Sequence, residues 1–342
     1  MELNDDITFA ELSEIWLYDV NTYLSWNWQK QQERFVNHLC RFIGNKKVKD
    51  VKSLDIDKII VELSRKNPNT NKPMAKKTLQ GLINTLIRIL DLAVENDIIT
   101  KNPAAKKKKK IPRSAPTKKV ECISEETQKL IPLVQHRAQP AAMIMLFCGL
   151  RTGEVLALQW NDIDFERKII SVTKSVQRVG PNLYQVKLGT KNSKSRVITI
   201  PECLSIFLSK LKTKTNPIDS DYINCQTDGR LHTPSSWKSV WKSYNTQLNF
   251  AKYKQLYPNN DVSIFSPEGT PKVLENVNAH QLRHTYATML YKSEVDLLTA
   301  SSLLGHSDVK LTLSIYTHLD EKYKQINISK LNDYINNNFY IY

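Results

Sequence analysis

A basic, proline-containing segment at 101–121 is the feature that most constrains how this chain can fold. It holds nine basic residues against one acidic residue, and three of its positions are proline. Prolines interrupt regular structure and like charges repel, so we expect an extended linker here. The sequence therefore predicts three parts: a domain at 1–100, the linker at 101–121 and a second domain at 122–342.

The linker contains five consecutive lysines, for which two interpretations stay open. The run is either a solvated tether, or a polycation that lies along a nucleic-acid backbone and releases counterions. The linker supplies a net +8 of the chain's +15, so the excess charge is concentrated between the domains. The second interpretation predicts backbone contacts by Lys106, Lys107, Lys108, Lys109 and Lys110.

The composition of the 342 residues is that of a folded globular chain, with 41% hydrophobic and 24% charged residues. No apolar run approaches the ~20 residues that a bilayer crossing needs. Acidic residues stand near the N-terminus, where a secretory signal would need basic and apolar ones. The five cysteines lack metal-ligand or redox spacing and are expected to be reduced. These features predict a cytoplasmic protein.

The first domain is predicted to be all helical. Thr8 and Glu11 have the spacing of a capping box at the start of a helix. Further helices are expected over about 29–42 and 55–66, and apolar residues over 79–94 form the stripe of a fourth. The stripes predict the core of a helical bundle rather than a cofactor site.

The second domain is predicted to mix helices with a small antiparallel sheet, so the chain as a whole is mainly α with an α+β second domain. Ser124 caps a helix expected to reach about His136, and helices return from Ser235 onward, apart from a polar stretch over 257–278. Strands are expected over 168–172, 184–188 and 196–200, the last two joined as a hairpin through 189–194.

Separate pieces of the second domain place basic residues in a fixed order, followed by a tyrosine. Alone, each has an ordinary explanation: Arg151 could pair with Glu154, and Lys191 could be a solvated turn residue. Tyr316 could belong to the core of an apolar helix. The pieces are Gly149-Leu-Arg151-Thr-Gly-Glu154, Lys191, His280-Gln-Leu-Arg283-His284, Leu304-Gly-His306 and Tyr316.

This ordered set resembles the tyrosine recombinase (phage integrase) family, and the resemblance covers nearly the whole chain. It implies a helical core-binding domain before the linker and a catalytic domain after it. Members of the family break and rejoin DNA through a covalent 3′-phosphotyrosyl bond. The resemblance implies no metal, nucleotide or redox cofactor, because that bond stores the energy of the broken phosphodiester.

The resemblance also implies a role for each residue. Cleavage gathers negative charge on the non-bridging phosphate oxygens, and guanidiniums are planar, bidentate donors suited to that charge. Arg151 and Arg283 match these positions. His280, one helical turn before Arg283, would share the phosphate or take the tyrosine proton. The other assignments are His306 as a donor to a non-bridging oxygen, Lys191 as the general acid, Tyr316 as the nucleophile and Glu154 as a supporting residue.

Several alternatives stay open. Lys187 and Lys194 could rival Lys191, although the run around Lys191 resembles the family's lysine hairpin. His280 and His284 could be two metal ligands on one helix, but no motif places a third ligand beside them. The chain could also be a catalytically silent DNA-binding regulator of the same fold, or a type IB topoisomerase-like enzyme that relaxes supercoils.

The favoured interpretation is a site-specific recombinase that integrates or excises a mobile element. Its expected partners are double-stranded DNA with specific recombination sites and, in the synaptic complex, three further copies in a homo-tetramer. We expect it in the cytoplasm, associated with the nucleoid. An arm-binding domain found in related integrases is either absent or trimmed from the sequence. The stretch 251–278 has no assigned role, and the tail at 327–342 is predicted to pack into a neighbouring protomer.

Overall fold

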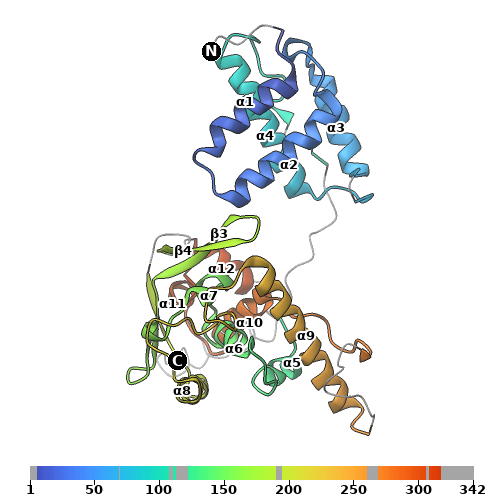
Figure 1. The fold of residues 1–342 in the computed structure, drawn as a ribbon. Coiled ribbons are helices and arrows are strands. Elements are labelled where there is room, and N and C mark those ends of the chain that lie inside the picture. The colour runs from blue at the N-terminus through green and yellow to red at the C-terminus, as the bar shows by residue number, and fades with distance from the viewer. Residues whose placement is uncertain are drawn as a thin grey trace, which may run out of the picture. The chain divides into compact units, whose positions relative to one another are not determined.

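The computed structural model describes residues 6–68, 70–107, 111–112, 122–189, 195–259, 269–305 and 308–316, with only the backbone for 314–316. The chain divides into two compact units, Met1–Lys119 and Val120–Tyr342 (Figure 1). This division falls inside the basic segment 101–121. Each unit has its own hydrophobic core, and both are mainly helical, as predicted. No helix among the described residues has the length and apolar character that a membrane crossing needs.

The described part of unit 1 is a bundle of four α-helices. At its start the Thr8 N–H donates to Glu11 Oε2 at 2.8 Å and the Glu11 N–H donates to Thr8 Oγ1 at 3.3 Å, which is the predicted capping box. The apolar stripe over 79–94 is buried against the other helices, and Leu82 and Ile83 are fully covered. The helices are α1 (Phe9–Asn21), α2 (Trp26–Ile43), α3 (Ser53–Arg65) and α4 (Lys76–Glu95).

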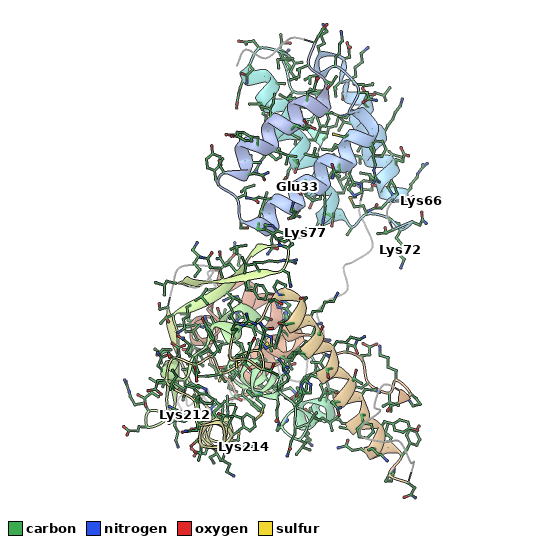
Figure 2. All side chains as sticks on the ribbon, in the orientation of Figure 1. Glu33, Lys66, Lys72, Lys77, Lys212 and Lys214 are labelled. Carbon is green, nitrogen blue, oxygen red and sulfur yellow. The ribbon has the colours of Figure 1, made fainter. Side chains whose placement is uncertain are left out.

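The lysines of unit 1 differ in their exposure. Lys66, Lys72 and Lys77 are exposed on the surface of the bundle (Figure 2). Lys107, from the basic segment, is different, because its side chain is only 5% exposed and its Nζ lies 2.5 Å from Asp57 Oδ2 on α3. The ion pair and the burial argue against the contact with a nucleic-acid backbone that the sequence predicted for Lys107.

The described helices of unit 2 are α5 (Glu125–Leu130), α6 (Gln139–Cys148), α7 (Thr152–Ala157), α8 (Glu202–Thr215), α9 (Pro234–Leu256), α10 (Ala279–Lys292), α11 (Leu297–Leu304) and α12 (Val309–Tyr316). The expected helix from Ser124 ends at Leu130 rather than near His136. Pro132 explains the early end, because proline has no N–H to donate to the carbonyl four residues before it. The Ser124 side chain accepts from the Thr127 N–H, as an N-cap should.

The predicted strands are present, but their pairing differs from the prediction. A three-stranded antiparallel sheet has the order β1-β2-β5, and β3 pairs with β4 in a separate ribbon. The expected hairpin between the strands at 184–188 and 196–200 is therefore wrong. Ile170 pairs with Ile198 and both are buried, so β5 joins the strand whose apolar face meets the core. The strands are β1 (Ile163–Asp164), β2 (Ile169–Val172), β3 (Lys174–Gly180), β4 (Leu183–Leu188) and β5 (Arg196–Thr199).

The stretch 251–278, which had no assigned role, begins inside α9 and leads into α10. Asn249 Oδ1 accepts hydrogen bonds from the N–H groups of Val273 and Leu274, at 2.8 and 2.9 Å. Asn245 Oδ1 accepts from the Val277 N–H at 2.6 Å. These two side chains of α9 fix the chain that enters α10, and α10 carries two of the predicted site residues.

Candidate active site

Arg151 lies at a break between two helices. α6 ends at Gly149, whose φ of +64° is the left-handed conformation that favours glycine, and a Cβ there would lie 2.2 Å from Tyr286 Cδ1. Two residues later Arg151 is the N-cap of α7, and its N–H donates to Glu154 Oε2 at 2.9 Å. The glycine turn thus ends α6 two residues before Arg151 begins α7.

The side chain of Arg151 makes two hydrogen-bonded contacts with described residues. Its Nη1 donates to Glu154 Oε1 at 2.9 Å, which is the ion pair offered as the ordinary explanation of this arginine. Its Nη2 donates to the carbonyl oxygen of Gly305 at 2.9 Å, so the guanidinium also reaches a segment 154 residues away in the sequence. The side chain remains 28% exposed, so it is not closed off from a ligand.

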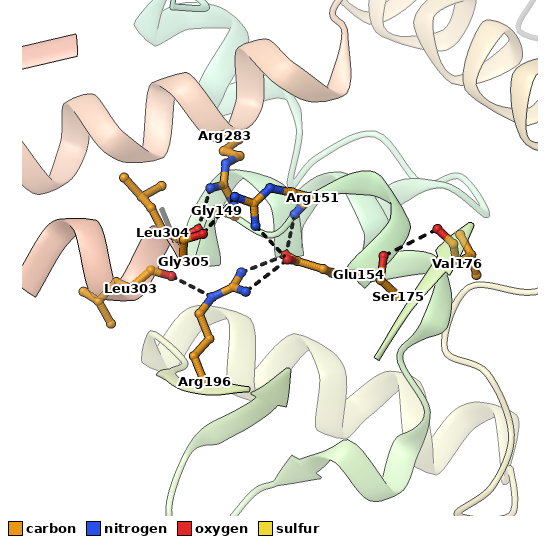
Figure 3. Close-up of polar contacts among 10 residues, drawn as sticks. All are labelled: Gly149, Arg151, Glu154, Ser175, Val176, Arg196, Arg283, Leu303, Leu304 and Gly305. Atoms are coloured by element: carbon orange, nitrogen blue, oxygen red, sulfur yellow. Dashed lines mark hydrogen bonds and ion pairs between the residues drawn. The ribbon is translucent and has the colours of Figure 1, made fainter. Parts of the chain in front are cut away.

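Arg283 lies deeper, on α10, and is 5% exposed. Its Nη1 donates to the Gly149 carbonyl at 2.6 Å and its Nη2 donates to the Leu304 carbonyl (Figure 3). Burial, followed by the positive charge of Arg151, lowers the pKa of Arg283 to about 9. The group still carries its charge at neutral pH, in an environment that would favour a nearby anion.

Arg196 completes the cluster and was missed as a site residue from the sequence. Its Nη1 and Nη2 donate to Glu154 Oε1 and Oε2 at 3.0 and 2.7 Å, and its Nε donates to the Leu303 carbonyl at 3.0 Å. A signal was available: Arg196 stands two and four residues before Ile198 and Ile200, which are both buried. An arginine in phase with the buried face of a strand needs a partner inside the fold.

The charges of this cluster do not balance. Arg151, Arg196 and Arg283 supply three guanidiniums, and Glu154 supplies the carboxylate that contacts two of them. Burial would raise the pKa of Glu154, but hydrogen bonds and charge from Arg196 and then Arg151 outweigh it, so the pKa lies below its ordinary value. The carboxylate is therefore ionised at neutral pH, and the cluster keeps an excess of positive charge suited to an anionic ligand.

The two histidines of α10 lie beside this cluster. Asn278 caps the helix by accepting from the Gln281 N–H at 2.9 Å, which puts His280 in the first turn and one turn before Arg283. Partial burial, then the charges of Arg283 and Arg151, lower the pKa of His280. Burial, then His280 and Arg283, lower the pKa of His284 to about 4. The ring centroids of the two histidines are 4.6 Å apart, edge to face.

The structure thus brings together Arg151, Glu154 and Arg283, with His280 one turn away. Among the described residues, no group of three or more His, Cys, Asp or Glu side chains could hold a metal ion, so His280 and His284 have no third ligand of these types there. Tyr316 ends α12, a helix that packs against α10 and α11. The side chain of Tyr316 is not among those that the structure describes. Also outside the described residues are Lys108, Lys109, Lys110, Lys191, Lys194, His306, His318 and the tail 327–342.

Comparison with known proteins defines the class. Residues 118–323 match the Phage integrase family. That range is more than half of the chain, and the chain therefore belongs to the phage integrase family, whose members are tyrosine recombinases.

Particular relatives agree with the class. A XerC-like tyrosine recombinase of Caldanaerobacter subterraneus subsp. tengcongensis is 29% identical over 96% of this chain and 83% of its own length. The ICEBs1 integrase of Bacillus subtilis is 28% identical over 86% of this chain and 76% of its length. The Tn1549 transposon integrase, solved with transposon right end DNA, has the same fold at 18% identity. Its TM-score is 0.72, over 95% of this chain and 100% of that one.

Proposed function

We propose that this protein is a site-specific DNA recombinase that cleaves and rejoins DNA through a covalent 3′-phosphotyrosyl intermediate. The observation that carries the proposal is the meeting of Arg151 and Arg283, from separate helices, in a cluster with an excess of positive charge. A scissile phosphodiester is an anion that gains charge on its non-bridging oxygens as it reacts, and fixed guanidiniums stabilise that charge. Membership of the phage integrase family supports the same chemistry.

In the proposed reaction the Tyr316 Oη–P bond forms as the P–O5′ bond breaks. The phenol proton leaves to a base, and the departing 5′-oxygen takes up a proton. His280 suits the first transfer, because its lowered pKa keeps the imidazole neutral and able to accept a proton at pH 7. Lys191 would protonate the 5′-oxygen, and His306 would donate to a non-bridging oxygen. Rejoining is the reverse attack by a 5′-hydroxyl, so no external energy source is needed.

The proposed substrate is duplex DNA at the ends of a mobile element, bound by four protomers at two sites. Similarity to the ICEBs1 integrase and to the Tn1549 transposon integrase favours an element that integrates and excises over a general relaxation enzyme. Exposed lysines such as Lys66, Lys72 and Lys77 on unit 1 and Lys106 in the basic segment supply charge for backbone contacts.

The test begins with repeated sequences that flank the gene, which define candidate element ends. A nicked duplex carrying one such end traps the covalent product, because the short strand beyond the cleavage diffuses away. The wild-type protein should form a DNA adduct that survives a denaturing gel, and Tyr316→Phe should bind the DNA but form none. Tyr291→Phe is the matched control and should react normally. An adduct with Tyr316→Phe would contradict the proposal.

A second arm of the experiment adds excess EDTA. Cleavage should continue, since guanidiniums neutralise the phosphate in the proposed mechanism. Loss of cleavage that returns with Zn²⁺ or Mg²⁺ would instead favour the alternative in which His280 and His284 bind a metal ion.

A further inference from the structure

The C-terminal end of α11 is held by three arginines in succession. The Leu303 carbonyl accepts from Arg196, the Leu304 carbonyl from Arg283, and the Gly305 carbonyl from Arg151 (Figure 3). These carbonyls belong to the last turn of the helix, which lacks intrahelical donors and carries partial negative charge. Three consecutive carbonyls thus connect three guanidiniums that come from the start of α7, from β5 and from α10.

Arg196 differs from the other two arginines, because it contacts both parts of the structure that position Arg151. Its two Nη atoms bind both oxygens of Glu154, and Glu154 Oε1 in turn accepts from Arg151 Nη1 at 2.9 Å. Its Nε binds the helix end whose next residues include Gly305, the other acceptor of Arg151. The Arg196 side chain is 8% exposed, so it is itself fixed by its surroundings and little of it can meet a ligand.

The backbone around Arg196 is equally constrained. Arg196 is the first residue of β5 and lies opposite Val172 in the core-facing sheet. Gly305 has φ of +62°, and a Cβ at this position would lie 2.9 Å from Arg196 Nη1, so a glycine permits the close approach of the turn to the guanidinium. In the sequence, Arg196 stands five residues after Lys191, and Gly305 directly precedes His306.

We propose that Arg196 is a positioning residue for the recombination reaction, which acts through Glu154 and the end of α11 to hold the Arg151 guanidinium against the scissile phosphate. The proposal rests on the proposed function. A lysine cannot take the place of Arg196, because one ammonium on a flexible stem cannot span two carboxylate oxygens and a carbonyl in a fixed plane.

The experiment is a double-mutant cycle on the rate of adduct formation with the nicked substrate at saturating DNA. Arg196→Lys should slow the reaction about 10²-fold, the size seen when one transition-state donor is removed or misplaced. Because Arg196 acts through Arg151, the same change in an Arg151→Ala background should cost no more than about threefold. DNA affinity and the melting temperature are measured for each variant. Arg230→Lys, in an exposed pair with Asp228, is the control and should stay within about threefold of wild type.

Two results would overturn the proposal: a wild-type rate for Arg196→Lys, or an equal loss in the presence and absence of Arg151. If Arg196→Lys melts below the assay temperature, Gly305→Ala replaces it in the same cycle, since its Cβ would displace the same guanidinium. Failure of the proposed function has a different signature, because the wild-type protein would then form no adduct.

Discussion

The cores of the two units are stabilised in different ways. In unit 1 the helices meet through apolar side chains such as Leu82 and Ile83, and burial of this kind is favourable wherever the shapes fit. In unit 2 a comparable apolar core is accompanied by a charged interior made of Glu154, Arg196 and Arg283, with the partly exposed Arg151 paired to Glu154 at its edge. Apolar packing of the first kind needs mainly complementary shape, whereas a charged interior needs each donor and acceptor in place.

Selection for stability alone would favour the apolar packing of unit 1 over the charged interior of unit 2. Burying a charge costs several kcal/mol per ion, and an apolar replacement of a buried ion pair is often neutral or stabilising. An excess of guanidiniums is still harder to explain by stability, because the positive charges of Arg151 and Arg196 repel that of Arg283. We therefore propose that the charged interior of unit 2 is preorganised to bind an anionic ligand.

The largest expected effect is on the stability of unit 1. Leu82→Ala removes a fully buried side chain and should cost roughly 2–5 kcal/mol of unfolding free energy, through reduced burial and a cavity. Leu54→Ala, at a position that is 63% exposed on α3, is the matched control and should change stability by less than about 0.5 kcal/mol. Urea unfolding of the full chain measures both. Equal effects would contradict the description of the unit 1 core.

Arg283→Lys should have its main effect on chemistry. The ammonium cannot reach the Gly149 and Leu304 carbonyls while also presenting donors to a phosphate, so adduct formation should slow on the order of 10²-fold. The measurement is the single-turnover rate with the nicked substrate, at a temperature where the variant is folded. A rate close to that of wild type would show that any cation suffices at this position.

Acidification should destabilise unit 2 more than unit 1. Burial, and then the charge of Arg137, lower the pKa of His232 to about 4. Its neutral form is therefore favoured in the fold, the stabilisation is complete above pH 6.5, and it is lost as the pH falls toward 4. At pH 5 the loss should be roughly 2 kcal/mol.

His232→Gln should remove that part of the pH dependence, as followed by urea unfolding at about pH 7.5 and about pH 5. His284, whose pKa is also lowered to about 4, should still contribute its own part of the pH dependence of stability in this variant. Unit 1 contains one histidine, His38, with a lowered pKa, so its transition should shift less. A larger acid shift in unit 1 would contradict this comparison.

The smallest expected effects concern the basic segment. Serine at Lys106 and at 108–110 should weaken binding to all duplexes alike and flatten the salt dependence of log K by up to ~0.9 for each phosphate that is no longer neutralised. Lys107→Ser should leave that slope unchanged and instead lower the stability of unit 1 by about 1 kcal/mol, because the ion pair with the partly solvated Asp57 is lost. A salt slope that responds to Lys107 but not to the other lysines would reverse this assignment.

The sequence predicts unit 1 better than unit 2, because unit 1 follows from local patterns and unit 2 depends on contacts between distant segments. The helices of unit 1 follow from local periodicity and capping, as the Thr8–Glu11 box and the stripe over 79–94 show. In unit 2 the resemblance to the family came from the order of Arg151, Lys191, His280, Arg283, His306 and Tyr316, because spaced motifs can be recognised when overall identity is low. The strand partners were not predictable locally, because β5 pairs with β2 across a ribbon that lies between them in the sequence.

Contacts between distant segments were the other limit. The Arg151–Glu154 pair is local and was foreseen, but the carbonyls of Leu303, Leu304 and Gly305 offer no sequence signal as acceptors. Arg196 gave a weak signal, because it lies two and four residues before the buried Ile198 and Ile200 of the same strand region. The burial of Lys107 gave none, because five identical lysines stand in a row and only the fold distinguishes them.

The central claim is that the charged interior of unit 2 serves phosphate chemistry rather than stability, and Arg151→Ala tests it most directly. Glu154 keeps its partner Arg196 in this variant, so the urea midpoint of unit 2 should stay close to that of wild type. The rate of covalent adduct formation should nevertheless fall on the order of 10²-fold or more. An Arg151→Ala protein that forms the adduct at the wild-type rate, or that loses activity only by unfolding, would contradict the claim.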